Sequence, residues 1–116
     1  MDYKFHYDKE NDILAVYNSP RKVKESLEVS ENIVIDLDKD DRINGIEIMD
    51  ASEFFGSFNM EINKEFLSML DSAEIDYRSF QNQWIILVVL KSKGKQFLQP
   101  MPPLRKTEFA SPLLAK

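Results

Sequence analysis

The central stretch of the chain, residues 32–50, reads Asn-Ile-Val-Ile-Asp-Leu-Asp-Lys-Asp-Asp-Arg-Ile-Asn-Gly-Ile-Glu-Ile-Met-Asp. Ile33 and Ile35 fall on one face of an extended chain, because successive side chains of a strand point to opposite faces. Ile46 and Ile48 repeat this alternation after an acidic turn. Isoleucine packs well on a pleated surface, and aspartate tolerates the backbone of a tight turn. The stretch therefore predicts a half-buried antiparallel hairpin.

The acidic residues of this hairpin also have the spacing of a calcium-binding loop. Four of them occupy the first, third, fifth and twelfth positions of an EF-hand loop, namely Asp36, Asp38, Asp40 and Glu47. However, the sixth position, where that loop needs glycine, is Asp41, and the flanking segments alternate as strands instead of helices. We therefore expect a solvated acidic turn, with a divalent-cation (calcium) site on these four carboxylates as the alternative.

The first half of the chain resembles a known family. The motifs that carry the resemblance are Tyr7-Asp8, Asp12-Ile13-Leu14, residues 33–40, Gly45-Ile46-Glu47-Ile48 and Asp50-Ala51-Ser52. Together they look like the prokaryotic family catalogued as domain of unknown function 2283, over residues 1–52. The resemblance implies a small β-rich domain with no established activity, and suggests an antitoxin-like partner protein of a two-gene module. It also implies glycine where this chain has Asp41.

The periodicity along the chain predicts an α+β fold. Five consecutive strands with short links predict an antiparallel β-meander over residues 1–52. Apolar residues at helical spacing predict one amphipathic helix within residues 53–73, packed on the meander. Residues 74–99 are expected to form a second, C-terminal β-hairpin, so that residues 1–99 make a single domain. Residues 100–116 begin with three closely spaced prolines, which predict that this segment forms an extended tail.

The second hairpin contains the most apolar run of the chain, at residues 84–90. Such a run is typical of a strand that is covered on both faces. We expect either a second layer or a subunit interface of a homodimer around it; the alternative is that the hairpin completes the main sheet. The tail could dock on a neighbouring molecule or lie along its own domain. The candidate partner-binding residues are Trp84, Ile86, Val88, Phe109 and Leu113.

Composition limits the partners and the compartment. The 116 residues carry a net charge of −5, which opposes nucleic-acid binding because phosphate contacts need clustered lysine and arginine. An acidic balance instead favours a basic protein partner. The absence of cysteine fits a reducing, cytoplasmic compartment. We expect no signal peptide and no membrane span, since the apolar run at residues 84–90 is far too short.

No combination of residues predicts catalysis or a cofactor. His6 is the only histidine and there is no cysteine, so no nucleophile–base pair can be assembled from these residue types. A solvated turn also offers no water-excluding pocket in which two carboxylates could act as acid and base. We therefore expect a non-catalytic protein-interaction or regulatory module, antitoxin-like in the sense of the family resemblance.

Overall fold

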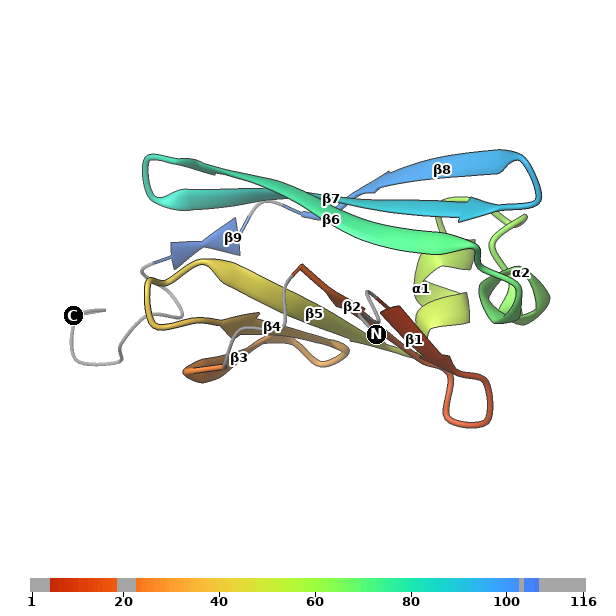
Figure 1. The fold of residues 1–116 in the computed structure, drawn as a ribbon, viewed down its shortest axis with the longest axis horizontal. Coiled ribbons are helices and arrows are strands. Elements are labelled where there is room, and N and C mark those ends of the chain that lie inside the picture. The colour runs from red at the N-terminus through yellow and green to blue at the C-terminus, as the bar shows by residue number, and fades with distance from the viewer. Residues whose placement is uncertain (1–4, 19–22, 103, 107–116) are drawn as a thin grey trace.

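The computed structural model describes residues 5–18, 23–102 and 104–106, in which two antiparallel sheets stack face to face with two short helices at one end (Figure 1). The expected α+β class, with an antiparallel meander, a helical segment and a second hairpin, is confirmed, although strand greatly outweighs helix. The buried apolar residues of both sheets and both helices form one cluster. The two sheets therefore share a single core.

The first sheet contains β1 (Phe5–Asp8), β2 (Ile13–Tyr17), β3 (Glu25–Ser30), β4 (Ile33–Leu37) and β5 (Ile43–Met49). Its strand order is β1-β2-β5-β4-β3, and all neighbours are antiparallel. β3, β4 and β5 are joined in sequence as the predicted meander, whereas β2 pairs with β5 and not with β3. The central position gives the core-facing isoleucines of β5 apolar neighbours on both sides, and such cross-strand pairs stabilise a sheet. The rows are Leu14–Ile48–Ile33 and Val16–Ile46–Ile35.

The helical segment contains two short helices, α1 (Ala51–Gly56) and α2 (Lys64–Ser68), and α2 is much shorter than the amphipathic helix that was expected within residues 53–73. Polar side chains interrupt the helical run: the Asn59 side chain accepts the backbone N–H of Glu61 at 2.9 Å, and the Asn63 side chain caps α2. Asparagine competes for backbone hydrogen bonds in this way and so favours turns and caps. Neither helix of the described chain is long and apolar enough to cross a membrane.

The second sheet contains β6 (Ser72–Phe80), β7 (Gln83–Ser92) and β8 (Lys95–Pro100), in the order β6-β7-β8, and β9 (Leu104–Arg105) also pairs with β7. This hairpin region therefore forms a second layer and does not complete the first sheet (Figure 1). β7, the most apolar strand, lies at the centre. β9 adds a short strand inside the region that was expected to be an extended tail.

The apolar run of β7 is buried on one face only. Its alternate side chains Trp84, Ile86 and Val88 are at most 3% exposed and belong to the core cluster. Ile85, on the opposite face, is 48% exposed. The run is therefore not covered on both faces, because no layer of the described chain lies outside the second sheet.

We predict different costs for two neighbouring isoleucines on β7. Ile86→Ala should lower the free energy of unfolding by about 2–5 kcal/mol, because it leaves a cavity between the sheets. Ile85→Ala should lower it by about 0.5 kcal/mol or less, since this side chain faces outward. Urea unfolding at low protein concentration measures both values. Equal losses in the two variants would contradict the one-sided burial of β7.

Candidate functional site

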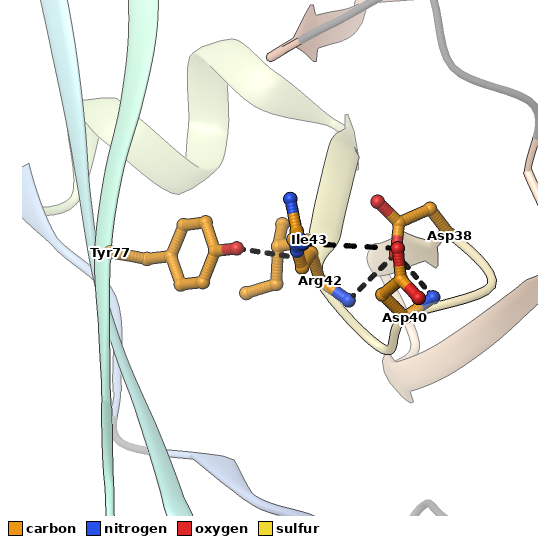
Figure 2. A network of polar contacts seen from close by, with 5 residues as sticks. All are labelled: Asp38, Asp40, Arg42, Ile43 and Tyr77. Atoms are coloured by element: carbon orange, nitrogen blue, oxygen red, sulfur yellow. Dashed lines mark hydrogen bonds and ion pairs between the residues drawn. The ribbon is translucent and has the colours of Figure 1, made fainter.

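The turn between β4 and β5 is organised by the Asp38 side chain (Figure 2). Asp38 is only 3% exposed, and its Oδ1 accepts the backbone N–H groups of Asp40 at 2.8 Å and Arg42 at 3.0 Å. Arg42 and Asp40 also form an ion pair at 3.8 Å. Asp38 thus acts as a structural acceptor for its own turn. This hydrogen-bonding use of aspartate is typical of turns.

Asp41, in the same turn, stands where the resemblance to the family implies glycine, and its backbone conformation shows how the substitution is accommodated. Its φ is 58°, in the left-handed region that glycine adopts without strain. Aspartate is one of the few other residues that visit this region routinely. The turn therefore keeps the backbone shape that glycine would provide, and Lys24 lies 3.6 Å from the Asp41 carboxylate.

The other two predicted calcium ligands lie on strands and not in the turn. Asp36 is paired with Gly45, and its Oδ1 accepts the Ser26 hydroxyl at 2.6 Å. Glu47 is paired with Val34 on the same sheet face. Across the described residues, no three histidine, aspartate or glutamate side chains are arranged to hold a metal ion. The structure therefore does not bring the four carboxylates together as a coordination shell.

The outer face of the first sheet, which points away from the second sheet, carries three carboxylates on β3, β4 and β5, with Asp8 and His6 at its β1 edge. We call this surface the acidic face and define it by Tyr17, Glu28, Asp36 and Glu47. The strand register places them in two adjacent rows, one containing Glu28 and Glu47 and the other Asp36 and Tyr17. The ion pairs found among the described residues involve other acids. These three carboxylates are therefore not neutralised by a lysine or arginine of the described chain.

Tyr17 lies across Gly45 in the middle of the acidic face. A Cβ atom at Gly45 would be 3.2 Å from Cδ1 of Tyr17 and 3.1 Å from the Val16 carbonyl oxygen, so the ring covers the glycine. Partial burial, and then the charges of Glu47 and Asp36, raise the pKa of the Tyr17 hydroxyl. The hydroxyl thus stays protonated beside the two carboxylates. The face combines negative charge with an aromatic ring, and both attract lysine and arginine.

A second polar cluster joins β1, the following turn and α1. The Asp12 carboxylate accepts the Tyr7 hydroxyl at 2.6 Å, the Ser52 hydroxyl at 2.7 Å and the Ser52 backbone N–H at 3.0 Å. Asp12 is only 8% exposed. Because it accepts the backbone N–H of Ser52, it caps the first turn of α1 from a distant part of the chain. Burial alone would raise the pKa of Asp12, but the hydrogen bonds from Tyr7 and Ser52 outweigh it and hold that pKa below its ordinary value.

This Tyr7–Asp12–Ser52 cluster was not predicted. Asp12 and Ser52 are 40 positions apart in the chain, and no local periodicity links them. The only signal in the sequence is that all three lie in motifs of the family resemblance. Because its hydrogen-bonding groups are used within the fold, we assign the cluster to structure and not to ligand binding.

The predicted partner-binding residues are divided between the core and the tail. Trp84, Ile86 and Val88 are buried between the sheets, so their side chains are not available to a partner. They were expected at a surface because the sequence does not show which face of β7 the first sheet covers. Phe109 and Leu113 lie outside the described residues.

Comparison with known proteins supports the resemblance over the first sheet. The family model described as "Protein of unknown function (DUF2283)" matches residues 4–52, a segment that contains all five strands of the first sheet, and the rest of the chain is unmatched. The chain is 42% identical over 52 residues to a "Putative hypoxanthine phosphoribosyltransferase" of Methanosarcina mazei, covering 45% of this chain and 42% of that protein. It is 37% identical over 67 residues to an "Uncharacterized protein" of Methanocaldococcus jannaschii, covering 58% and 57% respectively.

These alignments span about half the length of the curated relatives. No solved structure matches the chain significantly. The matched family model carries no activity in its description, and the second relative is uncharacterised. The Tyr7–Asp12–Ser52 cluster and the acidic face both lie within the matched segment.

We predict that millimolar calcium will leave the melting temperature unchanged. A ligand that binds only the native state must raise stability, and the four carboxylates are not brought together: Asp38 accepts two backbone N–H groups of the turn, Asp40 pairs with Arg42, and Asp36 and Glu47 lie on the strands. Thermal melting with calcium and with a chelator measures the effect. A calcium-dependent rise that is lost in Asp40→Asn would contradict this account.

We predict that Asp12→Asn will destabilise the fold near neutral pH by about 1–3 kcal/mol, because a charged acceptor of three hydrogen bonds is lost. Since the pKa of Asp12 is lowered in the fold, its contribution is present above the unfolded pKa and is lost as the pH falls through the folded pKa. The difference between wild type and variant should therefore shrink in acid. Unfolding measured from neutral to strongly acidic pH checks this, with Glu10→Gln, in the exposed turn that follows β1, as the control. A difference that does not depend on pH would contradict a role for the charge.

Proposed function

We propose that this protein is a non-catalytic interaction module that binds a basic protein partner through the acidic face. The observation that carries the proposal is the presence of Glu28, Asp36 and Glu47 on one sheet face, without a pairing cation from the described chain. Carboxylates in this state remain available to lysine and arginine side chains from another molecule. The net charge of −5 adds a long-range attraction for the same class of partner.

The strand positions of these side chains support recognition of a defined partner over loose ionic attraction. β4 and β5 are paired on both sides within the sheet, so the Cα positions of Asp36 and Glu47 are held by the register. The Ser26 hydroxyl further orients the Asp36 carboxylate. Fixed charges give specificity and a fast association rate more than they give affinity. Tyr17 supplies a partly exposed ring at which a cation can stack.

The family resemblance supports a regulatory, antitoxin-like role for this interaction module. Such a partner protein acts by occupying another protein's surface and needs no reactive group of its own. The phosphoribosyltransferase activity in the name of one relative belongs to that protein, of which the alignment covers 42%. The calcium-binding alternative has weaker support, because the Asp38 carboxylate already accepts two backbone N–H groups of its own turn.

The proposal is tested by capture of a partner on the immobilised full chain from native lysate of the source organism. The wild-type protein should recover a basic protein in stoichiometric amount, and added salt should release it, because exposed charge pairs are screened. Asp36→Asn/Glu47→Gln should lower the recovery at least about tenfold, which corresponds to about 1.4 kcal/mol.

The matched control is Glu53→Gln/Glu65→Gln, which also removes two negative charges, but from the helical end of the molecule. This control should retain the partner, which separates a local effect from an effect of net charge. Recovery of no stoichiometric partner would contradict the proposed function. Equal losses in the two double variants would contradict its assignment to the acidic face.

A further inference from the structure

The outer face of the second sheet is apolar at its centre, although nothing in the described chain covers it. Ile85, Leu87 and Val89 of β7 lie on this face, and the register pairs Val89 with Leu98 of β8. Ile85 is 48% exposed and Leu98 is 54% exposed, whereas Leu87 and Val89 between them are only partly exposed. Exposed apolar side chains grouped within a polar border are typical of an interaction site. We call these four residues the β7–β8 patch.

Charged residues on β6 border the patch in a definite order. The register places Glu74 beside Val89, Asp76 beside Leu87 and Arg78 beside Ile85. Two acids are therefore followed by one base along the edge of the same face. All three side chains belong to exposed residues, and none takes part in the ion pairs found among the described residues.

This order is self-complementary under two-fold symmetry. When two such sheets stack face to face about an axis that crosses the strands midway between Ile85 and Leu87, β6 lies over β6 and the rows run in opposite directions in the two copies. Because Asp76 pairs with Leu87 and Arg78 with Ile85, Arg78 of one copy then lies opposite Asp76 of the other, and Ile85 of one copy meets Leu87 of the other at the centre. In an isologous interface every contact occurs twice, so two such charge pairs form.

We propose that the β7–β8 patch is a homodimer interface, with a second copy of this chain as its occupant. The dimer should be weak. β6 and β7 have nine and ten residues. With about 3.3 Å per residue and about 4.8 Å between strands, three strands offer a flat area of roughly 400 Å². A standard interface buries about 800 Å² per partner, so this contact is at the small end of specific interfaces, where transient complexes are found.

Dimerisation through this patch would place the two acidic faces on opposite sides of the assembly. Each first sheet packs against the inner face of its own second sheet, so its outer face points away from the dimer axis (Figure 1). The dimer would then be bivalent for the basic partner, and this bivalency rests on the proposed function. The dimer itself does not depend on that function and is tested with purified protein alone.

Sedimentation velocity of the full chain over the micromolar range tests the interface. Wild type should show a concentration-dependent dimer, and Ile85→Lys should raise the dissociation constant at least about tenfold, because it buries a charge in the patch. Met60→Lys is the matched control, since Met60 is 88% exposed and lies between the helices. It should leave the constant unchanged. Unaltered melting of all three proteins at low concentration shows that the fold is intact.

A charge-reversal pair tests the orientation. Arg78→Glu makes the β6 border wholly acidic, and Glu74→Lys/Asp76→Lys makes it wholly basic, so each variant alone should be monomeric. Mixed in equal amounts, the two should form a heterodimer with the affinity of the wild type or better. Monomeric wild type at the highest concentration would overturn the proposal. A dimer that survives Ile85→Lys, or variants that fail to associate when mixed, would overturn it as well.

Discussion

The apolar contact between the two sheets is the interaction on which the rest of this structure depends. The inward side chains of β7, such as Ile86 and Val88, pack in one core cluster with the isoleucine rows of β4 and β5. Removal of apolar surface from water is the dominant favourable term in folding. Because side chains alternate along a strand, burying one face of each sheet determines at once which residues appear on the two outer faces. Both candidate surfaces follow from this packing.

The two outer faces differ in chemistry, and the difference suggests a division of roles. The first sheet presents carboxylates and Tyr17, which suit a charged partner and a salt-dependent contact. The second presents aliphatic side chains bordered by charges of both signs, which suit a copy of the same surface. Polar contacts such as the Tyr77 hydroxyl accepting the Ile43 backbone N–H at 3.2 Å tie the sheets together, so the two surfaces keep a fixed relation (Figure 2).

The failures of the sequence analysis have specific physical causes. The helical spacing within residues 53–73 identified Ile62 and other apolar residues that pack on the core, but asparagine turns divided the segment into two helices. The EF-hand spacing of the acidic residues combines strand alternation with a turn in which Asp38 accepts backbone N–H groups, and among the described residues no three such side chains are arranged to hold a metal ion. The Asp12 cap of α1 was missed because its partner Ser52 is brought near by sheet pairing and not by local sequence.

The sequence by itself determined the five strands of the first sheet, the position of the acidic turn, the second hairpin and the side chains that share a face, because all of these follow from alternation over a few residues. Only the tertiary structure decided that β2 pairs with β5, that the second hairpin is a separate layer, and that Trp84 points inward while Ile85 points outward. The physical reason is that an apolar strand can bury either face equally well. The choice is made by the partner layer, which comes from a distant part of the chain.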